Sequence, residues 1–247
     1  GIWELQFSPV STRLLVAVEL GPDVKIDSYN MGFVDEFEVG TWKQLRRLCV
    51  APTDGSKVRT VRYSPDGRWI ATGHQATYIP NERWWDDPRN SVIRIWDAKS
   101  FKLVQTLQGH RSGIRSLDFS PDSKLLVSAN GYQWANQVAI EGIEYTIRLW
   151  DVASGKEITS RKIEETVQCV RFTTDGTSVV SGSGGLGQEP LIQRWSVPTT
   201  EPSNPGRAAG SLPDETTPLS AQGTRSSPGK QRQVVDPLRV LPHDGSV

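Results

Sequence analysis

The sequence has few of the residues on which catalytic sites and disulfide scaffolds depend. Its 247 residues include three histidines, two cysteines and one methionine. Two cysteines in a chain of this length form no disulfide framework, and they favour a reducing compartment, so we expect an intracellular protein, nuclear or cytoplasmic. The three histidines have no visible cluster of partners for a metal site or a catalytic triad. We therefore predict no metal, no cofactor and no enzymatic activity.

Net charge and long apolar runs are also missing. The 28 basic and 28 acidic residues cancel, and the basic residues are scattered, which does not favour direct binding to nucleic acid or to an anionic membrane. No apolar run approaches the roughly 18 residues that a membrane span needs. The chain begins "GIWELQF", without a methionine, so we expect it to be a piece of a longer protein.

No segment shows the 3.6-residue apolar stripe of a long helix, but four segments resemble one another. They are "IWELQFSPVSTRLLVAV", "VRTVRYSPDGRWIATG", "IRSLDFSPDSKLLVSA" and "VQCVRFTTDGTSVVSG". Their aromatic anchors are 56, 56 and 53 residues apart, at Phe7, Tyr63, Phe119 and Phe172. Self-similarity at a fixed period is the mark of a repeat architecture.

A second series, in phase with the first, follows each segment. It contains "VGTWKQLRRL", "IRIWDAKSFKLVQTL", "IRLWDVASGKEITSRKI" and "IQRWSVPTT", with its tryptophans at Trp42, Trp96, Trp150 and Trp195. Alternation of apolar and polar residues indicates strands, and Ser-Pro-Asp-Gly is a turn sequence between two of them. The sequence therefore predicts an all-β fold with four strands, a to d, in each repeat.

These motifs resemble the WD40-repeat family of β-propellers. The third unit is the fullest match, with Gly109-His110 at its start, "FSPD", "LVSA", and "TIRLWD" ending at Trp150-Asp151, and Trp96-Asp97 is a second Trp-Asp pair. The resemblance implies four-stranded blades in which strands a to d run from a central channel outward. The chain holds about four blades, and we expect it to form part of a seven-bladed propeller whose remaining blades lie outside this segment.

The resemblance also implies a buried hydrogen-bond relay in each blade, from an opening His through a Ser or Thr to the Trp indole. In the third blade the members would be His110, Ser128 and Trp150, with Glu144 where the family prefers Asp. In the second and fourth blades Thr72 would serve Trp96 and Ser181 would serve Trp195. Asn90 and Glu189 would take the acidic position there, and Asp54 and Ile163 would replace the His.

The expected blades cover approximately residues 1–55, 56–110, 111–165 and 166–197. Residues 198–233 hold six prolines and almost no large apolar side chains, so we predict a disordered insertion between strands c and d. Residues 234–247 would complete the fourth blade with its outer strand and start a fifth repeat.

The extra length of each repeat is concentrated between strands b and c, at residues 19–38, 74–91, 131–145 and 184–190. Long loops on a rigid scaffold are a common place for binding sites. The aromatic residues in these loops either cover their own blade or contact a partner, and the candidates for partner binding are Tyr29, Phe33, Tyr78, Trp84, Trp85, Tyr132 and Trp134.

Two further motifs are assigned no chemistry. "GSGGLG" at residues 182–187 has the glycine spacing of a dinucleotide fingerprint, but a strand is expected after it and not the helix that would meet a phosphate. Gly73-His74 lies at the end of a strand b, where we expect a solvated loop histidine.

The function that these features favour is a non-catalytic scaffold that binds peptides of partner proteins on its loop-rich face. The quoted motifs are also similar to the C-terminal propeller of the fungal Tup-type transcriptional corepressors, which would make the chain part of a corepressor subunit. The alternatives are a sensor or regulatory WD40 module of a larger signalling protein and, more remotely, a propeller enzyme.

Overall fold

A computed structural model describes residues 1–19, 32–49, 57–75, 91–131, 144–164, 166–184 and 191–198. Within these ranges all regular elements are strands, and there is no helix long and apolar enough to cross a membrane. The first sheet contains β1 (Ile2–Phe7), β2 (Arg13–Glu19), β3 (Gly32–Glu38) and β4 (Gln44–Cys49). The second contains β5 (Lys57–Tyr63), β6 (Trp69–Gln75), β7 (Ile93–Asp97) and β8 (Leu103–Leu107).

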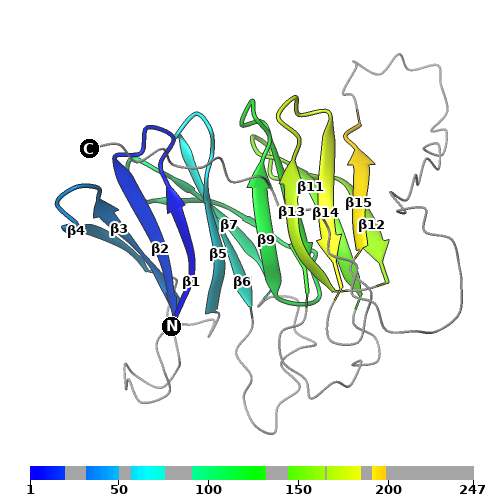
Figure 1. The fold of residues 1–247 in the computed structure, drawn as a ribbon, viewed down its shortest axis with the longest axis horizontal. Coiled ribbons are helices and arrows are strands. Elements are labelled where there is room, and N and C mark those ends of the chain that lie inside the picture. The colour runs from blue at the N-terminus through cyan, green and yellow to red at the C-terminus, as the bar shows by residue number, and fades with distance from the viewer. Residues whose placement is uncertain are drawn as a thin grey trace, which may run out of the picture.

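The third sheet contains β9 (Ile114–Phe119), β10 (Leu125–Asn130), β11 (Tyr145–Asp151) and β12 (Glu157–Ile163). In the described part of the fourth sheet there are three strands, β13 (Val167–Phe172), β14 (Ser178–Ser183) and β15 (Leu191–Ser196). Each sheet is antiparallel and pairs its strands in chain order (Figure 1). The prediction of an all-β fold built from antiparallel repeats is confirmed.

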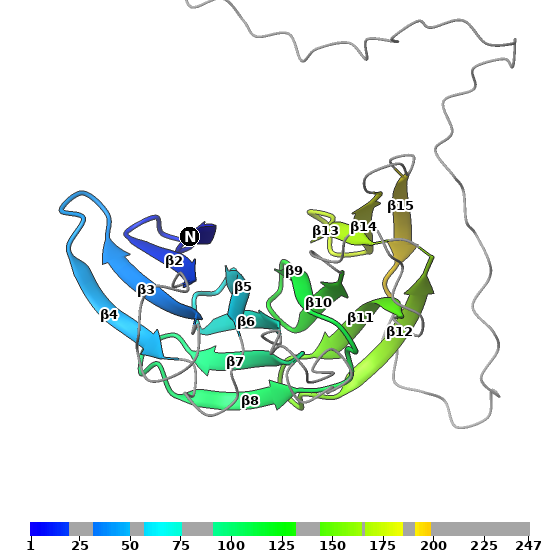
Figure 2. The same cartoon turned by 90° about the horizontal axis from the view of Figure 1, so that it is seen from below.

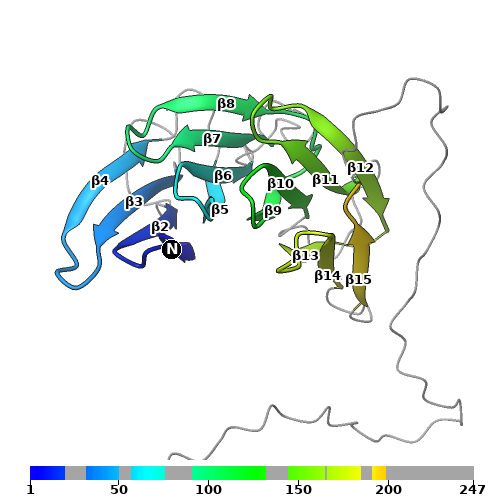
Figure 3. The ribbon, with the colours of Figure 1, turned by 90° about the horizontal axis from the view of Figure 1, so that it is seen from above.

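The sheets stand side by side around an open arc. Figures 2 and 3 show β1, β5, β9 and β13 on the inside of this arc and β4, β8 and β12 on the outside. The inner strands of neighbouring sheets contact each other along the whole series. Strand order from the centre outward is therefore the order of the chain, as the resemblance to propellers implied.

A bulge in each inner strand sets which residues face the neighbouring sheet. The pairing register between the inner strand and the next strand shifts once near the start of β1, β5, β9 and β13. An extra residue at a bulge changes the alternation of faces along a strand. As a result, Ile114 and Leu117, three residues apart, both enter the core between the second and third sheets.

Apolar clusters join each sheet to the next. Leu15, Ala17 and Val34 of the first sheet pack against the second, and Ala71 and Ile93 of the second pack against the third. A third cluster fills the space between the third and fourth sheets. The core thus lies between sheets, and both faces of a sheet take part in it.

The face of the first sheet that points away from the second sheet has no neighbour among the described residues. Leu5 and Phe7 are 55% and 48% exposed, whereas the residues at the same places in the third sheet, Leu117 and Phe119, are buried. At the other end of the arc Ile192 is 61% exposed. The same apolar positions are therefore buried or exposed according to whether another sheet covers them.

Trp42 does not occupy the place that the tryptophan series predicted. The residue of β3 that faces Leu14 across the sheet is Phe37, just as Trp96 faces Ile70 in the second sheet. Trp42 lies in the turn between β3 and β4, with a positive φ of 57° and an exposed fraction of 59%. The prediction for Trp42 was wrong because the fold requires an aromatic ring on the strand, and Phe37 supplies it.

The sheets have two edges of different character. The loop edge is where β2, β6, β10 and β14 end and the following strands begin, at the bottom of Figure 1. The turn edge is the opposite one, where tight turns join β1 to β2, β5 to β6, β9 to β10 and β13 to β14.

Removing a side chain from between two sheets should cost far more than removing its exposed counterpart. We expect Leu117→Ala to lower the free energy of unfolding by about 2–5 kcal/mol, because it leaves a cavity between the second and third sheets. Leu5→Ala changes the same repeat position on an exposed face and should cost less than about 1 kcal/mol. Urea unfolding followed by tryptophan fluorescence measures both, and equal losses would contradict the packing scheme.

Candidate functional site

The third sheet contains a buried chain of hydrogen bonds that ends at its tryptophan. The indole Nε1 of Trp150 donates to Ser128 Oγ at 2.8 Å, and Ser128 Oγ lies 2.7 Å from His110 Nε2. The other ring nitrogen of His110 lies 2.9 Å from Thr146 Oγ1. All four side chains are buried, so each polar atom depends on these partners.

Glu144 is not a member of this chain of bonds. Its carboxylate accepts a hydrogen bond from Lys162 Nζ at 2.5 Å on the surface, and this bond is the main cause that lowers the pKa of Glu144. The backbone N–H of Thr146 and its hydroxyl donate instead to Asn130 Oδ1. The role predicted for Glu144 was wrong, because the amide of Asn130 on β10 reaches the place where an acidic residue was expected.

The second sheet builds the same relay with a histidine from a different place in the chain. Trp96 Nε1 donates to Thr72 Oγ1 at 2.9 Å, and Thr72 Oγ1 lies 2.8 Å from His74 Nε2. Arg94 Nη1 lies 3.1 Å from His74 Nδ1, and both side chains are buried. The prediction that His74 is a solvated loop residue was wrong: it is a core histidine of β6.

A local signal for His74 was present in the sequence. Thr72 and His74 are two residues apart on one strand, so their side chains lie on the same face. Ser128 and Asn130 have the same spacing on β10, and Asn130 is also part of its relay. In both sheets, the residue two positions after the hydroxyl residue therefore supplies a polar partner.

The first and fourth sheets differ from this pattern. In the fourth, Trp195 Nε1 donates to Ser181 Oγ at 2.9 Å. In the first, Phe37 and Val16 take the places of the tryptophan and the hydroxyl residue, so the pair is apolar. An apolar pair leaves no indole N–H to satisfy, which avoids the cost of a buried donor without an acceptor.

The inner strands are linked by side chains that accept bonds from the next strand's backbone. Glu4 on β1 accepts from Thr60 Oγ1 at 2.6 Å and from Val61 N at 2.8 Å. Asp118 on β9 accepts from Phe172 N at 2.8 Å, and burial raises its pKa. Sequence reasoning did not identify these bonds, which fix the spacing of the inner strands.

Two buried carboxylates in the first sheet are paired with arginines. Glu36 accepts from Arg46 Nε at 2.9 Å and from the Tyr63 hydroxyl at 2.8 Å, and Asp35 is bonded by two nitrogens of Arg47. Burial and the neighbouring Glu36 raise the pKa of Tyr63. Because each carboxylate already has a fixed cationic partner, the arrangement is that of structural ion pairs between β3 and β4 of the first sheet, with the Tyr63 hydroxyl reaching Glu36 from the second sheet.

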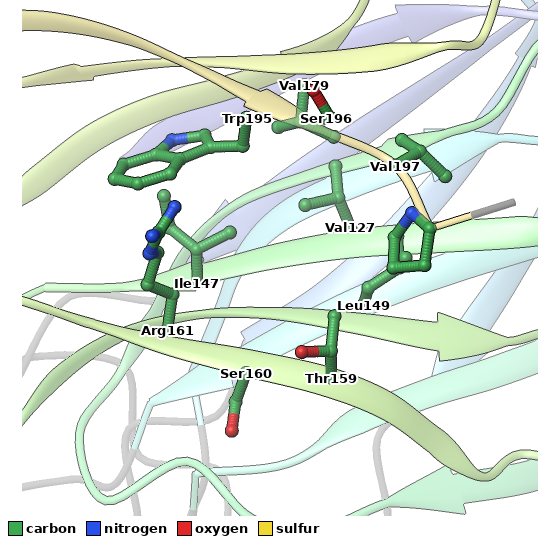
Figure 4. A pocket seen from close by; sticks show the side chains of 11 residues that line it. Val127, Ile147, Leu149, Thr159, Ser160, Arg161, Val179, Trp195, Ser196 and Val197 are labelled. Atoms are coloured by element: carbon green, nitrogen blue, oxygen red, sulfur yellow. The ribbon is translucent and has the colours of Figure 1, made fainter. Parts of the chain in front are cut away.

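A pocket opens between the third and fourth sheets (Figure 4). Its walls are mainly apolar, with Val127, Ile147 and Leu149 on one side and Val179, Trp195 and Val197 on the other. The Arg161 guanidinium lies over the Trp195 ring, 4.4 Å from its centroid. Among the described residues β15 has no neighbour on its outer side, and the outer strand predicted from residues 234–247 lies outside them.

Of the seven predicted partner-binding residues the structure describes one, Phe33. Phe33 belongs to β3, where Arg47 lies over its ring at 3.7 Å from the centroid, so its assignment to a loop was wrong. The strand β3 begins at Gly32, whereas the loop was predicted to extend to residue 38. The remaining candidates lie outside the described residues, and they are Tyr29, Tyr78, Trp84, Trp85, Tyr132 and Trp134.

Metal-ligand geometry does not occur in the described part of the chain, where there is no group of three or more His, Cys, Asp or Glu side chains that could hold an ion. The buried histidines, His74 and His110, are bonded to hydroxyl groups inside the sheets. Their surroundings suit a structural role better than proton transfer to a ligand.

Two segments of the chain match a known repeat. A family model described as WD domain, G-beta repeat matches residues 42–97 and 101–151. These two segments carry WD40 repeats. The two matches run from the turn before β4 to the end of β7 and from the turn before β8 to the end of β11, so each ends on the strand that holds the tryptophan.

Curated proteins with WD repeats are weakly similar to parts of the chain. The General transcriptional corepressor TUP1 of Saccharomyces cerevisiae is 36% identical over 69 residues, which are 28% of this chain and 8% of that protein. The Cilia- and flagella-associated protein 52 of Chlamydomonas reinhardtii is 31% identical over 131 residues, or 53% of this chain and 18% of that protein. The alignments therefore span well under half the length of these relatives.

Solved structures of WD40 propellers share the fold. The structure of U3-55K superposes with a TM-score of 0.56 at 19% identity and covers 80% of this chain and 49% of that chain. The crystal structure of RRP9 WD40 repeats gives the same TM-score and covers 48% of that chain. The fold is that of a WD40 propeller, and the arc corresponds to about half of each of these chains.

The hydroxyl group under the tryptophan can be tested by an isosteric change. We expect Thr72→Val to lower the free energy of unfolding by about 1–3 kcal/mol, because it leaves the indole N–H of Trp96 buried without an acceptor. Thr72→Ser keeps the hydroxyl and should cost less than about 1 kcal/mol. Chemical denaturation measures the difference, and equal effects of the two variants would show that the bond to Trp96 contributes little.

The buried His110 should make stability depend on pH. Burial, with the nearby Arg148 as a second cause, lowers the pKa of His110 from 6.5 to about 3, against the opposing effect of a bond with Asn130. Below pH 6.5 the unfolded chain binds a proton that the folded chain does not bind until about pH 3, so stability falls as the pH falls through this window.

Between pH 7 and pH 4.5 we expect the protein to lose about 2–3 kcal/mol more than a His110→Gln variant loses. Urea titrations at the two pH values measure this difference, and the carboxylates common to both proteins cancel in it. Parallel pH dependence of the two proteins would refute the assignment to His110.

Proposed function

We propose that the protein is a non-catalytic scaffold that binds peptide segments of partner proteins at its loop edge. The observation that carries this proposal is the asymmetry between the two edges. At the turn edge the strands are joined by tight turns, while at the loop edge β2 and β3 are separated by residues 20–31, and β6 and β7 by residues 76–92. Long connections on a rigid scaffold are where binding residues concentrate.

The rigidity of the scaffold is supported by the packing. Apolar clusters join successive sheets, and Glu4 and Asp118 connect successive inner strands. Partner recognition would use the aromatic residues of the connections, because large aromatic side chains dominate the binding energy of protein interfaces. Trp84 and Trp85 stand out, since the repeat pattern has no position for them.

The relatives support a scaffold more than any one process. Besides the corepressor and the cilia-associated protein, the WD repeat-containing protein VIP3 of Arabidopsis thaliana is 27% identical over 138 residues, or 51% of this chain and 36% of that protein. The names of the first two describe different processes, and the repeats are what these relatives have in common with this chain. We propose an intracellular, nuclear or cytoplasmic location on the same grounds.

A corepressor subunit is the narrower form of the proposal. Its support is the similarity to TUP1 over 69 residues, a length of a little more than one repeat. A regulatory module of a larger protein is the second candidate, because the chain spans 8% to 36% of the lengths of the three relatives described above. In either form we propose that further blades, among them one that starts within residues 234–247, complete the propeller.

The loop edge is tested by a double substitution of Trp84 and Trp85 with Ala. We expect the variant to lose most of its partner recovery in quantitative pull-downs, by about tenfold or more, because two aromatic anchors are removed. Its thermal midpoint should stay within about 2 °C of the parent protein, since the repeat core does not include these residues.

The matched control is Trp42→Ala, which removes an exposed tryptophan from the turn edge and should leave recovery unchanged. Unchanged recovery by the double variant would contradict the proposal. A double variant that lost recovery together with its thermal stability would instead assign Trp84 and Trp85 to a lid over their own blade.

A further inference from the structure

The turn edge carries four copies of one tight turn. Each turn begins with a hydroxyl residue, at Ser8, Ser64, Ser120 and Thr173, and its fourth residue has a positive φ between 53° and 70°. In each, the N–H of the fourth residue donates to the carbonyl of the first, at 2.8 or 2.9 Å. The four turns therefore have the same backbone shape.

Three of the turns also hold a carboxylate in the same way. The third residue of these turns is an aspartate, and one of its oxygens accepts from the first residue's hydroxyl and from the N–H of the fifth residue. In the second sheet Asp66 accepts from Ser64 Oγ at 2.6 Å and from Arg68 N at 3.0 Å. Asp122 and Asp175 have the same two bonds, and these bonds lower the pKa of both carboxyl groups.

The first turn presents these donors without the carboxylate. Val10 stands where the other turns have aspartate, and it is 75% exposed. Ser8, which is only 8% exposed, accepts a bond from Arg13 N through its hydroxyl oxygen. Within the described residues neither the Ser8 hydroxyl proton nor the Thr12 N–H has an acceptor.

A groove between the first and second sheets runs beside this turn, and it carries positive charge. Its charged residues are Arg13, Arg46, Lys99, Glu36 and Asp66. The first carboxylate is neutralised by Arg46, and the second is held within its own turn. Arg13 and Lys99 form no ion pair within the described structure, although Lys99 helps to lower the pKa of the nearby Asp97, and the three cations of the groove outnumber its two carboxylates.

We propose that this groove binds an acidic segment of a partner protein, with an Asp or Glu side chain accepting from Ser8 Oγ and Thr12 N. The apolar Val10 side chain cannot accept from these donors, so they stay available to a carboxylate oxygen of a ligand that approaches beside Val10, which is 75% exposed. A carboxylate is favoured over a phosphate because the same pair of donors holds an aspartate in three turns of this chain. Arg13 and Lys99 attract the neighbouring acidic side chains.

This site lies at the edge opposite the loop edge, so it does not depend on the function proposed above. Tyr63 and Pro9 line the same groove and supply the apolar surface on which the stem of an acidic side chain can rest. In the other three turns an aspartate of the turn itself accepts from the two donors. In the first turn, which has Val10 instead, the same donors are available to a ligand.

The decisive variant restores the missing carboxylate. A fluorescein-labelled octapeptide of alternating Ala and Glu should bind the full 247-residue chain, as measured by fluorescence anisotropy, and shift the backbone amide signal of Thr12 in NMR spectra. Val10→Asp should weaken binding by about tenfold or more, because its own carboxylate takes both donors, and should raise the thermal midpoint. Val10→Ala should keep the affinity. An octapeptide of alternating Ala and Gln should not bind.

Charge variants test the groove independently of the turn. Arg13→Gln and Lys99→Gln should each weaken binding of the Glu peptide about threefold to fivefold. Lys124→Gln makes the same charge change beside the third sheet's turn, where Asp122 is present, and should have no effect.

Several results would overturn the proposal. They are no binding of the Glu peptide, equal binding by the Val10→Asp variant, or an effect of Lys124→Gln as large as that of Arg13→Gln. Tighter binding of a phosphoserine peptide at the same groove would overturn the assignment to a carboxylate. None of these results bears on Trp84 and Trp85, so the two proposals fail separately.

Discussion

The burial of both faces of every sheet is the constraint on which this structure depends. A four-stranded sheet in this chain has apolar residues on its two faces, so it cannot bury its surface alone. Each sheet therefore needs a neighbour on either side, and the second and third sheets have both. The arc follows from this requirement. When twisted sheets pack face to face in a series, each is rotated relative to the one before, so the series curves around an axis.

The tryptophans of the second, third and fourth sheets add a polar requirement to this apolar packing. Its ring fills the space between sheets, but its N–H must find an acceptor once it is buried. Thr72, Ser128 and Ser181 provide one, and the hydroxyl in turn joins a histidine in the second and third sheets. In the first sheet the ring and its partner are both apolar, Phe37 and Val16, so the two positions differ together. The fold requires that no buried N–H lacks an acceptor. A tryptophan with a hydroxyl residue meets this requirement, and so does a pair of apolar residues.

The two edges of the sheets have different physical characters, and this separates scaffold from binding surface. At the turn edge most of the polar groups are satisfied inside each turn, which leaves little for a ligand to bind. The first turn is the exception, since Val10 leaves two donors open beside a positively charged groove. At the loop edge the connections between strands are long, and the bonds of Glu4 and Asp118 hold successive inner strands of the scaffold together.

The sequence by itself determined the repeats, the strands and the turns. Alternation in segments such as "IRSLDF" and the turn residues of "SPDG" are local, and local chemistry is enough to specify a strand or a tight turn. Tertiary structure decided which group satisfies which. Asn130 and Phe37 took the roles that had been assigned to Glu144 and to Trp42, and His74, which was expected to be a solvated loop residue, bonds Thr72 in the core. A buried polar atom bonds the partner that packing brings within about 3 Å, and that partner can come from any strand of the sheet, so spacing along the chain cannot identify it.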